Sequence, residues 1–215
     1  MRQVLAVLGF YWLLLRDFFA SRTRKLWVVV PLLALATWLL MVSAPPKPQD
    51  RTLSSLPTPV GFLGEGPVRW HLVLWWRCPA CKRLLAGMGP VLEGQKEVPF
   101  RVSLYFLDLS PRDAEKTVYT FCRIGEGEPA GILLKRLTFG PEVLPDDLVR
   151  SYKDKPCWEE GLRLSGEMRQ VLMKQGVSWT PALIQAEERG GRLLAPEPEN
   201  YDLFLKELGL AGFGG

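Results

Sequence analysis

The hydrophobic pattern of the last two thirds of the chain alternates between strand-like and helix-like periods. Residues 68–76 (VRWHLVLWW) suit a buried strand, and KRLLAGM continues as a helix until Gly89 and Pro90 end it. A second strand is expected at 98–107, helices at 111–123, 129–138 and 158–175, strands at 182–186 and 192–194, and a final helix capped by Asn200. The order predicts an α/β domain over residues 68–210: a βαβ half, a helical insert over about 110–176, and a ββα half.

The N-terminal part has a different pattern, because no charged residue occurs between Leu26 and Pro46. About 20 apolar residues are enough to cross a bilayer, so residues 26–44 are predicted to be a transmembrane anchor. A signal peptide cleaved after Val42-Ser43-Ala44 is the alternative, and the two prolines that follow disfavour it. The apolar run at 4–15 is too short to span and is expected to lie at the interface, with a two-helix hairpin as the alternative.

The distribution of charge decides on which side of the membrane the domain lies. Residues 1–25 carry five basic residues and one acidic residue, so this segment holds the whole formal charge of +4. The positive-inside rule keeps this basic segment in the cytoplasm and places the domain outside. The rest of the chain is neutral, which argues against a nucleic-acid partner. Residues 45–67 contain six prolines and are predicted to form an extended linker.

The candidate chemistry begins directly after the first strand, where Cys78-Pro79-Ala80-Cys81 opens the helix. A cysteine at a helix N-terminus is stabilised as a thiolate, and Arg77 and Lys82 add positive charge. Cys78 is therefore predicted to be the nucleophile and Cys81 the buried resolving thiol. A zinc site is the alternative, but the other two cysteines are distant in sequence, and the single histidine, His71, lies inside the strand. We therefore expect no metal and no cofactor.

A second signal lies far downstream, where Trp179-Thr180-Pro181 leads into an apolar strand. A proline beside a redox pair removes one backbone N–H and exposes the preceding residue to an extended substrate. Thr180 and Pro181 are therefore predicted to form a substrate-docking edge. An ordinary trans proline at a strand start is the alternative. Trp179 is either part of the substrate site or a packed aromatic residue at the edge of the core.

Three stretches resemble the catalytic domain of periplasmic disulfide isomerases of the DsbC/DsbG type, within the thioredoxin superfamily. They are Trp76 to Lys82, Asp113 to Arg123, and Pro156-Cys157 followed by a helix into GVSWTPALI. The resemblance covers about residues 60–210 and implies a thioredoxin fold with a helical insertion. It also implies a structural disulfide between Cys122 and Cys157 and an electron-exchange partner in the membrane. The chain departs from that family by having a proline-rich segment in place of the dimerisation domain, and Trp179 where relatives usually have glycine.

These patterns together predict a thiol–disulfide oxidoreductase, anchored in the inner membrane, whose redox domain faces the periplasm. Its substrates would be proteins with thiols or disulfides. The rival interpretation is a thioredoxin-like docking component of an envelope or secretion apparatus with a non-catalytic disulfide. The sequence leaves open the redox direction, the substrate, the oligomeric state and whether residues 4–20 span the membrane.

Overall fold

The computed structural model describes residues 34, 37, 49–140, 144–188 and 190–210. The chain divides into two compact units, residues 1–47 and 48–215, and the second contains the predicted redox domain. The predicted anchor at 26–44 and the basic segment before it lie almost entirely outside the described residues. Within the described ranges, no helix combines the length and the apolar character needed to cross a membrane.

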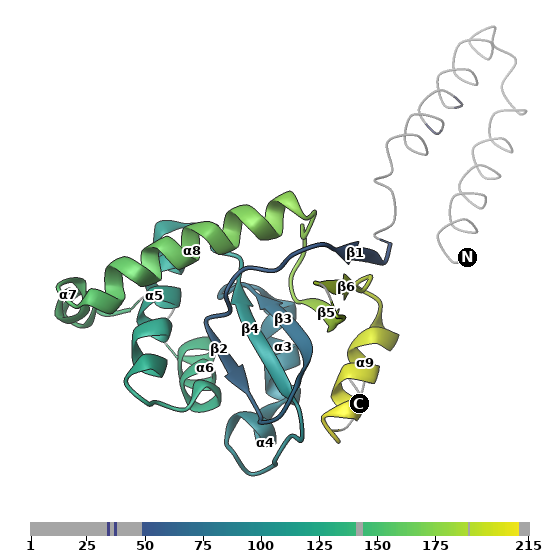
Figure 1. Cartoon of the computed structure of the whole chain (residues 1–215), viewed down its shortest axis with the longest axis horizontal. Helices are drawn as coiled ribbons and strands as arrows, with labels where there is room; N and C mark the ends of the chain where they lie inside the picture. The colour runs from purple at the N-terminus through teal and green to yellow at the C-terminus, as the bar shows by residue number, and fades with distance from the viewer. Residues whose placement is uncertain (1–33, 35–36, 38–48, 141–143, 189, 211–215) are drawn as a thin grey trace, which may run out of the picture. The chain divides into compact units, whose positions relative to one another are not determined.

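A single mixed sheet forms the centre of the second unit (Figure 1). Over the described residues it has six strands in the order β1-β6-β5-β3-β4-β2. β3 runs parallel to β4, whereas β5 is antiparallel to β3 and β6 is antiparallel to β5. The strands are β1 (Arg51–Leu53), β2 (Gly61–Leu63), β3 (Val68–Leu74), β4 (Arg101–Phe106), β5 (Ala182–Ala186) and β6 (Gly191–Leu193).

The central strands are buried on both faces, as expected for parallel strands covered by helices. In β4 every residue from Val102 to Phe106 is buried, and the last five residues of β3 are buried too. On one face Trp70 meets Phe204 of α9 (Pro198–Glu207), with ring centroids 5.5 Å apart. Beyond the end of β3, Trp76 stacks on Phe106 at 4.2 Å. The stacking of Trp76 on Phe106 therefore fixes the direction in which the chain leaves β3.

The connections between these strands give the topology. β3 reaches its parallel neighbour β4 through α3 (Pro79–Gly87) and the short α4 (Gly89–Leu92), a βαβ unit. β5 and β6 then pair as a hairpin, and α9 follows them. This is the thioredoxin fold. The predicted α/β class, the βαβ and ββα halves and the helical insertion between them are confirmed.

The insertion consists of the helices between β4 and β5, which gather to the left of and above the sheet in Figure 1. Gly161 lets α8 approach α5 closely, because an added Cβ there would lie 2.9 Å from Val118 Cγ1. The helices are α5 (Pro111–Gly125), α6 (Ala130–Phe139), α7 (Asp146–Lys153) and α8 (Pro156–Lys174). The sequence pattern did not indicate α7, since this helix has only eight residues, is mostly polar, and buries only Val149 and Tyr152.

Two expectations need correction. The proline-rich stretch 45–67 is not simply a linker, because β1 and β2 lie within it and pair with β6 and β4. Both are three-residue strands with prolines around them, and such short edge strands carry almost no alternation. In addition, Asn200 does not cap α9: the helix begins at Pro198 after Glu197, and the Asn200 amide donates to the Ala195 carbonyl.

Candidate active site

Cys78 is the N-cap residue of α3 and marks the exit from the central strand. Its backbone is extended, and Pro79 occupies the first helical turn. The Cys81 backbone N–H, one turn into the helix, donates to Cys78 Sγ at 3.2 Å. Cys78 thus takes the place of the serine or aspartate that usually caps a helix, and its sulfur receives one of the helix's unpaired amides.

The loop before β5 approaches Cys78 from the other side. In its protonated form Cys78 donates to the Thr180 carbonyl oxygen, 3.1 Å from Sγ, although the two residues are 102 positions apart. The Thr180–Pro181 peptide bond is cis. The Pro181 carbonyl accepts a 2.7 Å hydrogen bond from the Tyr201 hydroxyl of α9. The structure therefore brings together four of the residues singled out in the sequence, and adds Tyr201.

The two thiols titrate very differently. The pKa of Cys78 is lowered to about 5, first by the hydrogen bond from the Cys81 side chain; burial opposes the shift, and Thr180 and backbone amides support it. Burial raises the pKa of Cys81, and its hydrogen bond with Cys78 adds to the rise. At neutral pH Cys78 is accordingly the thiolate and Cys81 the neutral thiol.

The origin of this asymmetry differs in part from the sequence-based argument. Arg77 and Lys82 were expected to help ionise Cys78, but the leading causes of its lowered pKa are hydrogen bonds, first the one from Cys81. The Arg77 guanidinium instead meets Asp113, with Nε 3.2 Å from Oδ1. The two cysteines supply the main contribution themselves, because one thiol donates to the sulfur of the other.

Both sulfurs are well enclosed. Cys78 is 5% exposed and Cys81 is 1% exposed, so the predicted nucleophile is more buried than its role suggested. Trp179, next to Thr180, packs partly buried against the core. Its indole nitrogen is buried, and no described residue accepts a hydrogen bond from it. Little of Cys78 is therefore open to solvent.

A group of contacts that sequence reasoning missed holds the segment before Cys78. Trp75 Nε1 donates to Asp113 Oδ2 at 3.2 Å, and Trp76 Nε1 donates to Thr117 Oγ1 at 3.0 Å. Asp113 follows the helix cap Ser110 by three residues, a spacing that by itself indicates only a local capping role. No sequence signal links Asp113 to Trp75, because the contact exists only once α5 has packed beside the strand.

A buried polar chain continues from these contacts into the insert. The Thr117 hydroxyl donates to Asp108 at 2.8 Å, and the Ser165 hydroxyl of α8 donates to the other Asp108 oxygen at 2.6 Å. Burial raises the pKa of Asp108 to about 6. His71 is a buried residue of β3 with Nδ1 3.3 Å from the Tyr105 hydroxyl, and burial lowers its pKa to about 4. No cluster of metal-ligating side chains occurs among the described residues.

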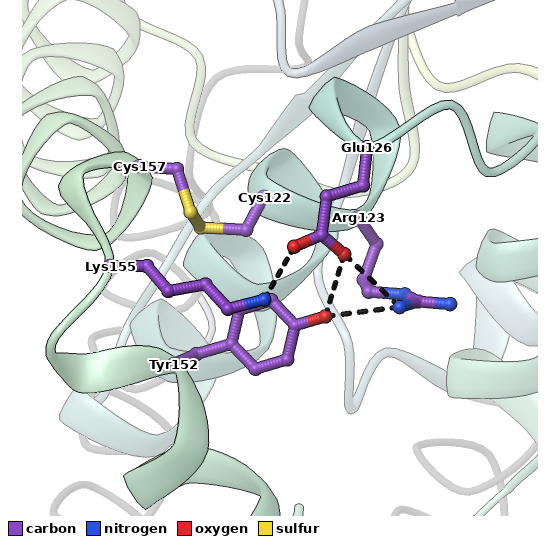
Figure 2. The surroundings of a disulfide bond; sticks show 6 residues. All are labelled: Cys122, Arg123, Glu126, Tyr152, Lys155 and Cys157. Atoms are coloured by element: carbon purple, nitrogen blue, oxygen red, sulfur yellow. Dashed lines mark hydrogen bonds and ion pairs between the residues drawn. A yellow bond between two sulfur atoms is a disulfide. The ribbon is translucent and has the colours of Figure 1, made fainter.

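The other two cysteines, Cys122 and Cys157, form a disulfide, which is the pairing that the family resemblance implies. Figure 2 shows Glu126 beside it, accepting from Lys155 Nζ at 2.5 Å and from the Tyr152 hydroxyl at 2.8 Å. Arg123 donates to the same Tyr152 hydroxyl at 3.0 Å. The bond therefore joins the last turn of α5 to the start of α8 within a surface charge network.

Comparisons with known proteins concern the fold. No protein-family model matches the sequence, and no curated protein matches it significantly. Among solved structures, a periplasmic thioredoxin-like protein from Salmonella enterica is similar, with 17% identity, a TM-score of 0.47, and coverage of 69% of this chain and 89% of that one. Proteus mirabilis ScsC in a transitional conformation has 18% identity, a TM-score of 0.46 and coverage of 95% and 98%. DsbA from Xylella fastidiosa has 14% identity, a TM-score of 0.48 and coverage of 74% and 92%.

Proposed function

We propose that this chain is an extracytoplasmic thiol–disulfide oxidoreductase that exchanges disulfides with protein substrates. The observation that carries the proposal is that the Cys81 backbone N–H donates to Cys78 Sγ at 3.2 Å and that hydrogen bonds, first the one from the Cys81 side chain, lower the pKa of Cys78 to about 5. A sulfur that is ionised at neutral pH and sits beside a neutral thiol is suited to exchange.

The reaction needs no atom beyond the substrate and the two cysteines. The Cys78 thiolate attacks one sulfur of a substrate disulfide, forms a mixed disulfide, and releases the other substrate sulfur as a thiolate. Cys81 then loses its proton to solvent and attacks Cys78, which releases the second substrate thiolate. The substrate disulfide is reduced by two electrons and the Cys78–Cys81 pair is oxidised; the reverse sequence oxidises a substrate dithiol.

Substrate docking is assigned to the edge formed by Thr180 and Pro181. Thr180 touches Cys78 through its carbonyl, and Pro181 leaves no backbone donor at the next position. An extended peptide that carried its cysteine to Cys78 would run along this edge. Trp179 adjoins Thr180 in the chain and is assigned to the same substrate site.

The setting of the reaction belongs to the same proposal. Residues 26–44 would anchor the domain in the inner membrane with the redox pair in the periplasm, and a membrane protein would supply or remove electrons. The Cys122–Cys157 disulfide supports an oxidising compartment, where such bonds persist. The narrower kinship with DsbC/DsbG-type isomerases, drawn from the sequence alone, remains part of the hypothesis.

Two cysteine variants test the function. Cys78→Ser should abolish exchange with a model disulfide, whereas Cys81→Ala should accumulate a mixed disulfide that a non-reducing gel or mass spectrum detects. If Cys78→Ser kept full exchange activity, the proposed oxidoreductase function would be excluded. The docking-component alternative predicts a Cys78–Cys81 disulfide that resists dithiothreitol and has a potential below about −300 mV; a catalytic pair titrates between thioredoxin and DsbA values.

A further inference from the structure

Two carboxylates hold the two ends of the central strand β3 with the same set of donors. At its start, Glu207 of α9 accepts from Trp70 Nε1 at 2.7 Å and pairs with Arg69 at 3.0 Å. Beyond its end, Asp113 of α5 accepts from Trp75 Nε1 and pairs with Arg77, both at 3.2 Å. Each carboxylate therefore binds one indole and one guanidinium, and only the second pair adjoins the redox cysteines.

Asp113 is built into its place. Its side chain is 3% exposed, and the Ser110 hydroxyl donates to Oδ2 at 2.7 Å in addition to the two contacts from the strand segment. Burying a carboxylate is costly unless donors surround it, and here three side chains supply them. The arrangement ties the first turn of α5 to the residues that lead into Cys78.

Trp75, which Asp113 holds by its indole, contacts both cysteines through its backbone: the amide of Cys78 and the side chain of Cys81. Its carbonyl accepts from the Cys78 N–H at 3.1 Å, and its backbone also makes a hydrogen bond to the Cys81 side chain. A shift of Trp75 would therefore move the amide of one cysteine and the hydrogen-bond partner of the other. Trp76 is fixed by Thr117, one helical turn after Asp113, so α5 secures this segment at consecutive positions.

We propose that Asp113 is a positioning residue of the redox pair: through Trp75 and Arg77 it holds the segment that sets the spacing of Cys78 and Cys81. The helical insert then has a role in the chemistry as well as in the fold. This inference rests on the proposed exchange function. Its test measures the pKa of the Cys78 thiol directly, so the positioning role and the exchange function can be refuted separately.

The test titrates the Cys78 thiolate by ultraviolet absorbance in the reduced pair of the full-length chain. Trp75→Phe removes the indole donor without changing any charge, and the Cys78 pKa should rise by about one unit because the hydrogen bonds to its sulfur weaken. The double variant Arg77→Gln/Asp113→Asn keeps the net charge of the wild type and should show the same rise. Recovery of the wild-type pKa in this double variant would mean that Asp113 only balances the charge of Arg77, and would overturn the proposal.

The matched control uses the contacts of Glu207 with Arg69 and Trp70 at the start of β3. Arg69→Gln/Glu207→Gln removes the same chemical groups far from the cysteines, and it should leave the Cys78 pKa unchanged even if the free energy of unfolding falls. An equal shift in this control, or no shift in Trp75→Phe, also refutes the positioning role. If the wild-type thiol itself titrates at an ordinary value, the proposed function fails instead.

Discussion

Cys78 and Cys157 stand in similar local settings and end in different chemical states. Each adjoins a proline in the first turn of a helix: Cys78 caps α3 before Pro79, and Cys157 follows Pro156 in α8. Cys78 is a free thiol that contacts Cys81, a residue of its own helix. Cys157 is joined to Cys122, 35 residues away in α5. A helix start is therefore not sufficient to make a redox site; the neighbouring groups decide whether a sulfur is activated or locked.

The largest expected difference between the two pairs is in stability. Replacing Cys122 and Cys157 by serine should lower the free energy of unfolding by about 3–4 kcal/mol, because the bond closes a long loop in the unfolded chain. The Cys78 pKa should not change. Denaturant unfolding of the two proteins measures the first effect and thiolate titration the second. A loss below about 1 kcal/mol would show that this disulfide does not brace the insert.

The Cys78–Cys81 pair should instead be distinguished by the pH dependence of the free energy of unfolding. Because folding lowers the pKa of Cys78 from 9.0 to about 5, the thiolate stabilises the reduced protein fully above pH 9, and the contribution is lost as the pH falls through about 5. At pH 7 the free energy of unfolding of the reduced wild type should exceed that of Cys78→Ser by about 2–3 kcal/mol. His71 and Asp108 are the same in both proteins, so their titration cancels. A stability difference that does not vary with pH would contradict the lowered pKa.

The smallest expected effect is on the pKa of Cys157 when its disulfide partner has been removed. In a Cys78→Ala/Cys81→Ala background, Cys122→Ala leaves Cys157 as the one free thiol. Its pKa should be lowered by less than about one unit, because a helix N-terminus alone contributes about 0.3–1 kcal/mol and no second thiol donates to it. The pH dependence of alkylation measures this value. A Cys157 pKa near that of Cys78 would mean that a helix N-terminus alone is enough to lower a cysteine pKa to this extent. The contrast drawn between Cys78 and Cys157 would then be wrong.

Several parts of the fold could be predicted because the signal was local. The strand 68–76, the helix after Cys78 and the hairpin near 182–194 each carry their own periodicity, and β3, α3, β5 and β6 are found there. β1, β2 and α7 could not be predicted in this way. They are three to eight residues long and are held by pairing or packing with distant segments. Asn200 looked like a cap because its residue type is common there, yet Pro198 starts the helix earlier.

The sequence alone determined the order of those elements that carry their own periodicity and the position of Cys78 at a strand-to-helix junction, since both depend on neighbours within a few residues. The tertiary structure decided the environment of that sulfur: Thr180 comes to it from 102 residues away, and Asp113 reaches Trp75 from the inserted helix. Charges close in sequence, such as Arg77, turned out to bind elsewhere. The physical reason is that a hydrogen bond depends on distance and direction in space, and these are set only when the sheet and the insert have packed together.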